Sequence, residues 1–393
     1  MRFSKRLDQV PPYLFAELER RISSMEAEGI DVISLGIGDP DLPTPEPVIE
    51  AAARAMHDPA THDYPTNHGT KAFREAVASF YRDRFGVDLD PNGEIVPVLG
   101  GKEGVSHVAL ICLDPGDLCL SPDPGYPPYT SGPLFAGSEP YYLPLAEENG
   151  FLPDLGSIPG DVTARANLLF LNYPNNPTGA IVREGYFDEA VEFAREHELI
   201  VVHDNAYSEI CFEGYRAPSF LQTPGAKDVG VEIFSLSKGW NMTGWRCALM
   251  AGNPEVVERY RQLKTNIDSG MFEAMQAAAA AALTEARDFP AEMSEVYERR
   301  RDLVADALRS IGLHVTPPLA TPYFWARVPE GYTSGSFSEL VLERAAVVVS
   351  PGSAYGPSGE GFVRISLTVP DDRLEEAVSR IETALAGTSF HGA

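Results

Sequence analysis

The spacing of hydrophobic positions changes repeatedly between about residue 46 and residue 283. Short runs of aliphatic and β-branched residues alternate there with stretches in which apolar residues recur every three or four positions. This alternation is typical of an α/β fold with a mainly parallel sheet covered by helices. One helical stretch, 184–198, places Phe187, Val191 and Ala194 on a single face. The runs that we interpret as strands are Ile95 to Leu99, Leu118 to Ser121, Leu168 to Leu171, Leu199 to His203, Ile233 to Leu236 and Cys247 to Ala251.

A different pattern follows the last of these strands. A long helical stretch from about Phe272 to Ile311 leads away from the predicted sheet. The runs after it predict a smaller α+β domain, and a length of 393 residues also favours more than one core. We expect a large domain over 46–283 and a small domain made of 1–45 and 284–393. The small domain should contain strands at Tyr323 to Val328, Ala346 to Val349 and Phe362 to Leu367, and helices at about Ser336 to Arg344 and Asp371 to Ala386.

The charge balance of the chain argues against two classes of partner. Lysine and arginine number 31 against 57 acidic residues, which gives a net charge of −26. Such a surface repels nucleic acid and anionic membranes, so we expect neither as a partner. A phosphate or carboxylate ligand must then be bound by specific arginine, lysine and backbone N–H groups.

The cysteines and the start of the chain indicate a cytoplasmic protein. The four cysteines stand singly in apolar stretches, with no Cys-x-x-Cys pair and no histidine cluster at metal spacing, so we expect no metal site. Residues 1–13 carry basic side chains but no apolar run of the kind a secretory signal needs. The longest apolar tract is alanine-rich and far shorter than a membrane span.

The first candidate for chemistry is Lys238, which directly follows a predicted strand. A lysine at a strand end among small and hydroxyl residues can lose solvation and become a usable amine nucleophile. Ser235, Ser237 and Arg246 surround it in the sequence and could form a phosphate cup. Taken alone, however, a lysine is more often a surface residue.

A second candidate is the turn at Gly101 and Lys102, where a strand gives way to a helix. The free N–H groups and the dipole of such a helix start favour an anion. The turn is not a Walker A loop, because Glu103 follows the lysine and the upstream glycine spacing is absent. A purely structural glycine turn is the alternative.

Asp204 emerges from another apolar strand, and Tyr207 lies three residues later. A partly buried carboxylate requires a cationic or proton-bearing partner. The tyrosine hydroxyl could donate to a ligand oxygen. An aspartate that merely caps a helix would account for the same position.

Two further side chains stand in or after predicted strands. Asn176 belongs to a proline-fixed loop that presents its amide rigidly, although a plain turn would have the same composition. Arg364 is flanked by apolar residues in a strand, where a guanidinium needs a carboxylate partner. That carboxylate could come from the protein itself or from a substrate.

Together these stretches resemble the fold-type I pyridoxal-phosphate aminotransferases, from about Pro11 to Ile381. The resemblance implies that Lys238 holds the cofactor as an imine and that Asp204 pairs with the pyridine nitrogen. Asn176 and Tyr207 match residues that bind the ring oxygen. Tyr126 matches the residue that stacks on the ring, and Arg364 matches the arginine that binds the substrate α-carboxylate. The implied phosphate site comprises Gly101, Lys102, Ser235, Ser237 and Arg246.

Within that family, two N-terminal motifs most resemble LL-diaminopimelate aminotransferases and their close relatives. The resemblance implies that Tyr13 and Gly38 approach the substrate. It also implies that Tyr64 reaches the cofactor phosphate of a neighbouring subunit, so that the enzyme is a homodimer with shared active sites. The segment Lys264 to Phe272 departs from the family pattern, because it lacks the expected asparagine–glycine pair and any arginine for a second carboxylate.

The implied reaction moves an amino group from an L-amino acid to 2-oxoglutarate by a ping-pong mechanism. Lys238 would carry the proton, and Asp204 would keep the ring nitrogen protonated. Other donors, such as aspartate, alanine or aromatic amino acids, fit the same residues. A β-elimination lyase would use the same lysine, and a non-catalytic regulatory module is the alternative outside enzymes.

Overall fold

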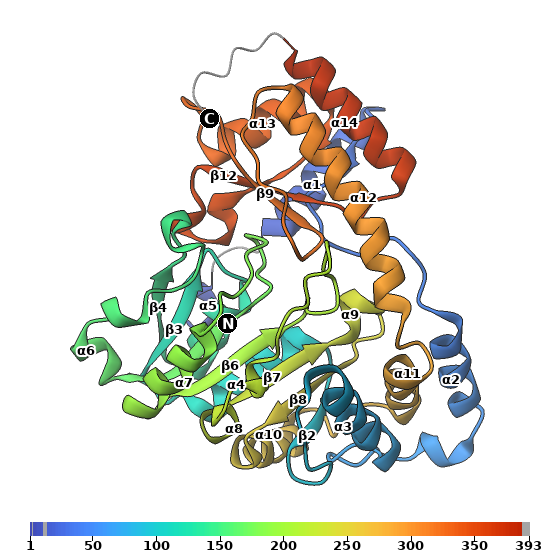
Figure 1. Cartoon of the computed structure of the whole chain (residues 1–393), viewed down its shortest axis with the longest axis vertical. Helices are drawn as coiled ribbons and strands as arrows, with labels where there is room; N and C mark the ends of the chain where they lie inside the picture. The colour runs from blue at the N-terminus through green and yellow to red at the C-terminus, as the bar shows by residue number, and fades with distance from the viewer. Residues whose placement is uncertain (2, 11–13, 387–393) are drawn as a thin grey trace.

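A computed structural model describes residues 1, 3–10 and 14–386 of the chain, and Figure 1 shows how they are arranged. The lower part of this view is built on a sheet of seven strands. In spatial order the strands are β2 (Ile95–Val98), β8 (Ala248–Gly252), β7 (Gly230–Ser235), β6 (Ile200–Asn205), β5 (Ala166–Leu171), β3 (Leu118–Asp123) and β4 (Glu139–Pro144).

The prediction of a mainly parallel sheet is confirmed. Neighbouring strands from β7 to β4 are all parallel, and β8 alone runs against its two neighbours in this sheet. Parallel strands need crossover connections, and the helices between them supply these. The helices of this part are α2 (Glu46–Met56), α3 (Lys71–Phe85), α4 (Gly101–Cys112), α5 (Pro128–Ala136), α6 (Gly160–Thr163), α7 (Tyr186–Glu196), α8 (Ala226–Val229), α9 (Leu236–Gly239), α10 (Pro254–Ile267) and α11 (Glu273–Thr284).

Alternate side chains of the central strands enter two cores, one on each face of the sheet. In β5, Leu168 and Phe170 pack in the core that includes α4 and α10. Leu169 and Leu171 point the other way, into the core that includes α3 and α7. Because both faces are covered, the strands read as continuous apolar runs rather than as alternating ones.

The upper part of Figure 1 holds a smaller sheet with its own core. Its strands are β11 (Ser350–Pro351), β12 (Phe362–Ser366) and β9 (Tyr323–Arg327), and neighbouring strands are antiparallel. A separate two-stranded sheet pairs β1 (Ile33–Ser34) in parallel with β10 (Val347–Val348). The division of the chain into the two expected domains stays a prediction. The helices of this part are α1 (Leu14–Ala27), α12 (Phe289–Ser310), α13 (Ser334–Ala345) and α14 (Asp371–Leu385).

Two features of the fold differ from the sequence prediction. The stretch expected as one long helix from Phe272 to Ile311 is divided into α11 and α12. Pro290 stands in the first turn of α12, where its missing N–H costs nothing, but it would interrupt a continuous helix. The edge strand β4 was not predicted, because its partly exposed polar residues and its two prolines hide the strand pattern.

The fold brings the functional candidates to one edge of the large sheet. Strands β2, β3, β5, β6 and β7 point the same way, and the loops at their carboxyl ends carry the predicted site residues. Open parallel sheets bind ligands at this edge. Among the described residues, no helix is both long enough and apolar enough to cross a membrane.

A buried histidine–glutamate pair lies beneath the same strands. The His203 ring contacts Glu232 Oε2 at 2.8 Å through Nδ1 and the Tyr173 carbonyl at 3.0 Å through Nε2. The two ring nitrogens thus contact two oxygen acceptors on different elements. Burial alone would raise the pKa of Glu232, but its hydrogen bonds, that with His203 foremost, outweigh burial and leave this pKa below its usual value. Glu232 also accepts from Ser219 and Tyr81.

Glu232→Gln is expected to lower the free energy of unfolding by about 3–5 kcal/mol, because it removes the buried carboxylate that contacts His203, Tyr81 and Ser219. Urea unfolding of the cofactor-free protein measures this change. Glu258→Gln is the matched control, since Glu258 is exposed in its pair with Arg261 and should leave the midpoint nearly unchanged. Equal midpoints for the two variants would contradict a stabilising role for the Glu232 carboxylate.

Candidate active site

A cavity of about 260 Å³ opens at the carboxyl ends of the parallel strands. It brings together residues that are far apart in the sequence, including most of the predicted site. Its walls are formed by Ile37, Gly38, Asp39, Gly101, Lys102, Tyr126, Tyr129, Asn172, Asn176, Asp204, Ala206, Tyr207, Ser235, Ser237, Lys238, Thr243 and Arg246.

Asp204 projects into this cavity from the end of β6 and is only 5% exposed. Tyr129 donates a hydrogen bond to Oδ2 at 2.8 Å, whereas no donor within the described part of the chain reaches the buried Oδ1. Burial raises the pKa of Asp204 to about 6, although the hydrogen bond from Tyr129 opposes this rise. A buried carboxylate with one unused oxygen fits a cationic ring N–H, such as that of a protonated pyridine.

Lys238 lines the same cavity as Asp204. It stands on α9, the short helix that follows β7. Ser235 ends the strand and caps this helix by accepting from the Ser237 backbone N–H at 3.3 Å. The lysine Nζ donates to the carbonyl oxygen of Gly38 at 2.5 Å. The amine therefore points into the cavity, toward the N-terminal segment, and not into bulk solvent.

The predicted phosphate residues lie close together at the start of α4. Gly100 has φ +85°, and a Cβ atom there would lie 2.2 Å from Nη2 of Arg246. The guanidinium therefore rests against the turn, and its Nη1 donates to the Thr243 carbonyl at 2.7 Å. Together with the backbone N–H groups at the start of α4, which no side chain caps, this arrangement suits an anion.

Arg364 is buried behind the cavity, next to the asparagine loop. Its Nη1 donates to Asn176 Oδ1 and its Nη2 to the Gly36 carbonyl, each at 2.8 Å. The guanidinium also lies over the ring of Tyr323, 4.2 Å from the ring centroid. These two acceptors are neutral, and a guanidinium in this place can bind a carboxylate ligand.

Tyr323 is a residue of the site that the sequence reasoning missed. Its hydroxyl lies 3.2 Å from the hydroxyl of Tyr207. A Cβ atom on Gly38 would lie 2.2 Å from the same hydroxyl, so position 38 has room only for glycine. Tyr323 thus fills the space between the cavity wall and Arg364.

Tyr129 and Asn172 were also missed, although both hold Asp204 in place. Asn172 donates to the Asp204 carbonyl at 2.8 Å and accepts from the Asn176 backbone N–H at 2.9 Å. The only sequence signal for Tyr129 was its position three residues after Tyr126. Its contact with Asp204 depends on how α5 packs on the sheet.

Of the predicted residues that the structure describes, Tyr64 and Arg364 are absent from the cavity walls. Tyr64 is 91% exposed, so its expected contact with a neighbouring subunit stays a prediction. Tyr13 lies outside the described residues. The segment Lys264 to Phe272 was expected near the distal end of the substrate. In the structure Lys264 is buried, whereas Ile267 and Phe272 are exposed.

Comparisons with known proteins agree with this geometry. The family model for aminotransferase class I and II matches residues 30–381. An LL-diaminopimelate aminotransferase of Moorella thermoacetica is 53% identical over 390 residues, which cover 99% of this chain and 100% of the relative. One of Desulforudis audaxviator is 51% identical over 387 residues, covering 98% and 99%.

A solved structure resembles the whole fold. A probable N-succinyldiaminopimelate aminotransferase from Thermus thermophilus superposes with a TM-score of 0.89 at 39% identity. The match covers 94% of this chain and 99% of that one. The predicted resemblance is therefore confirmed, and the chain belongs to the aminotransferase class I and II family as an enzyme that depends on pyridoxal phosphate.

Proposed function

We propose that this enzyme transfers an amino group from LL-diaminopimelate to 2-oxoglutarate, with the cofactor held in the cavity around Lys238 and Asp204. The observation that carries the placement of the cofactor is the buried Oδ1 of Asp204, which lacks a donor among the described residues and faces the cavity that holds the lysine amine. The choice of donor rests on the full-length similarity to relatives that bear this name.

Lys238 is proposed to move the proton in the reaction. Bound pyridoxal phosphate supplies an aldehyde for the amine and a ring that withdraws electrons from the substrate. The Lys238 amine would then be the group that accepts and returns the proton at the substrate α-carbon. The Gly38 carbonyl, which accepts from Nζ at 2.5 Å, is the group that orients the free amine.

Asp204, Asn176 and Tyr207 are proposed to hold the ring. The ionised Asp204 favours a proton on the ring nitrogen, since a buried carboxylate is stabilised by a nearby cation. The Asn176 amide and the Tyr207 hydroxyl project into the cavity and could both hydrogen-bond the ring oxygen. Tyr126 is proposed to stack on the ring, and the phosphate would occupy the turn beside Gly101, Lys102, Ser235, Ser237 and Arg246.

Arg364 and Gly38 are proposed to receive the substrate, together with Tyr13. Arg364 donates to two neutral acceptors, Asn176 Oδ1 and the Gly36 carbonyl. A substrate carboxylate that replaces one of these acceptors would form an ionic hydrogen bond, which is stronger than the neutral one it replaces. Gly38 has no side chain, so the Tyr323 hydroxyl can pack beside it while the Gly38 carbonyl accepts from Lys238.

We also propose a homodimer in the cytoplasm. Tyr64, Ile267 and Phe272 are large hydrophobic residues that are exposed in the single chain, and Gly270 packs against Pro65, the residue after Tyr64. Exposed apolar side chains that gather on one face favour an interface. A second chain there would bring its Tyr64 to the first chain's phosphate turn, as the resemblance implies.

A donor screen tests the proposed substrate. With 2-oxoglutarate as acceptor, we expect LL-diaminopimelate to form glutamate with a kcat/KM at least about tenfold above N-succinyl-diaminopimelate, aspartate, alanine or aromatic amino acids. Lys238→Ala should form none above background. A better rate with any other donor would reassign the substrate. Release of ammonia and pyruvate from cysteine, without glutamate formation, would indicate a lyase.

Asp204→Asn is expected to slow amino transfer by about 10²-fold or more while the cofactor still binds, because the neutral amide cannot keep the ring protonated. Titration of the cofactor-free protein adds a pH signature. Burial raises the pKa of Asp204 to about 6, so below that pH the neutral acid cannot pair with a ring cation and affinity should fall. The variant should lack this loss of affinity, and an identical pH profile in both proteins would refute the pairing.

Arg364→Ala should raise KM for the amino donor by roughly 10²-fold through loss of the ionic hydrogen bonds to its carboxylate. Cofactor affinity should change far less. Arg327→Ala is the matched control, since Arg327 is an exposed arginine on the adjacent strand β9 that pairs with Glu147. If KM stays within about threefold of the wild-type value, Arg364 does not bind the carboxylate.

A further inference from the structure

Lys264, on α10, is fully buried in the described structure, which is unusual for a lysine. Its Nζ donates to Asp268 Oδ2 at 2.7 Å and to Glu103 Oε1 at 3.4 Å. Nζ also lies 5.9 Å from the centroid of the Tyr260 ring. A buried ammonium is costly unless it is paired, and here it is shared by two carboxylates.

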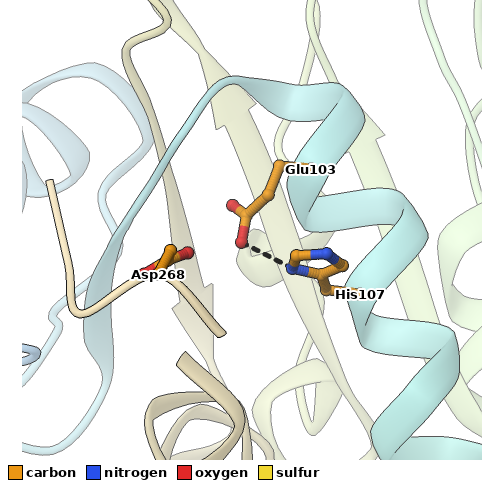
Figure 2. Close-up of side chains that lie close together, drawn as sticks. All are labelled: Glu103, His107 and Asp268. Carbon is orange, nitrogen blue, oxygen red and sulfur yellow. Dashed lines mark hydrogen bonds and ion pairs between the residues drawn. The ribbon is translucent and has the colours of Figure 1, made fainter. Parts of the chain in front are cut away.

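Glu103 connects this lysine to the proposed phosphate turn. It stands in the first turn of α4, directly after Gly101 and Lys102. Its Oε2 accepts from the Leu99 backbone N–H at 3.0 Å. Its Oε1 accepts from His107 Nδ1 at 2.8 Å, which is the contact marked in Figure 2. The carboxylate therefore fixes the backbone from which the turn at Gly100 and Gly101 begins.

The cluster in Figure 2 has a composition that could hold a metal ion. Glu103, His107 and Asp268 offer ligand atoms that all lie within 4.8 Å of one another. Lys264, however, already brings a positive charge into contact with both carboxylates. The ammonium satisfies the electrostatic need that a metal would otherwise meet, so we assign the cluster a different role.

The charge of Glu103 matters because of its position. Burial alone would raise its pKa, but the contacts with His107 and Lys264 outweigh burial and leave the pKa below its usual value, so the group is ionised at neutral pH. A carboxylate directly behind an anion-binding turn repels a phosphate, and this repulsion is little screened where water is excluded. The ammonium of Lys264 cancels that repulsion and leaves the hydrogen bond to Leu99 in place.

Asp268, the other carboxylate partner of Lys264, connects this lysine to the segment around Tyr64. Asp268 Oδ1 accepts from the Gly270 backbone N–H at 2.8 Å. Gly270 has φ +104°, and a Cβ atom there would lie 3.3 Å from the Thr66 carbonyl oxygen. One ammonium thus joins the phosphate turn of this chain to the loop that carries Tyr64.

We infer that Lys264 is a positioning residue for the cofactor phosphate: it neutralises Glu103 behind the turn at Gly101 and Lys102 and, through Asp268, fixes the loop that follows Tyr64. The inference rests on the proposed place of the phosphate. It predicts that the lysine favours binding of a phosphorylated cofactor over the same ring without phosphate.

Lys264→Met, which keeps the length of the side chain and removes its charge, tests this inference. Cofactor-free protein prepared from the holoenzyme is titrated at pH 8 with pyridoxal phosphate and with pyridoxal. We expect the Kd of pyridoxal phosphate to rise at least about tenfold and that of pyridoxal to stay within about threefold. Lys227→Met is the matched control, because Lys227 pairs with Glu94 away from the cavity and should change neither value.

Glu103→Gln tests the same charge from the opposite side and retains an acceptor for the Leu99 N–H. Alone, it should tighten binding of pyridoxal phosphate without affecting pyridoxal. Combined with Lys264→Met, it should return the Kd of pyridoxal phosphate to within about threefold of the wild-type value. The single variant Glu103→Gln tests the inference even if Lys264→Met folds poorly.

Equal losses for both ligands in Lys264→Met would show a general structural role and overturn the inference, as would an unchanged ratio of the two Kd values. Arg246→Ala, measured in parallel, separates this failure from failure of the proposed function. If Arg246→Ala selectively weakens pyridoxal phosphate and Lys264→Met does not, the phosphate site stands and the role of Lys264 is wrong. If neither variant discriminates, the phosphate lies elsewhere and both proposals fail.

Discussion

The carboxylate of Asp204 is the constraint on which the active site depends. A strand that passes between two apolar cores can place an acid at its end only if the acid's hydrogen-bonding needs are met locally. Tyr129 and Asn172 meet part of them, and the His203–Glu232 pair occupies the opposite face of the same strands. One oxygen of this carboxylate, Oδ1, has no hydrogen-bond donor among the described residues. The proposed pairing with a cationic ring rests on that oxygen.

Much of this site could be predicted because its residues stand where apolar strands end. Lys238, Asp204 and Asn176 each follow a run that reads plainly as a strand, and parallel strands bring their carboxyl ends to one edge. Gly101 was recognisable for the same reason. The resemblance to a known family then supplied the roles of residues, such as Tyr126, that carry no local signal of their own.

The residues that were missed depend on tertiary packing. Tyr129 lies on a helix, and Tyr323 begins a strand of the smaller sheet, so neither follows a strand that ends at the cavity. Both contribute hydroxyls that meet their partners only after distant elements pack together. Nothing in the local sequence around Lys264 shows that two acids will contact it in the fold. Short-range sequence patterns therefore predict the site residues at strand ends better than they predict the contacts that support those residues.

The N-terminal segment is tied to both parts of the molecule through its backbone. The carbonyl groups of Gly36 and Gly38 accept from Arg364 and Lys238, and the Tyr323 hydroxyl occupies the space beside Gly38. Positions 38 and 323 are therefore not independent in evolution. A larger residue at position 38 would fit only after position 323 had changed to a smaller residue. The order in which the two substitutions occur therefore limits which related sequences can evolve from this one.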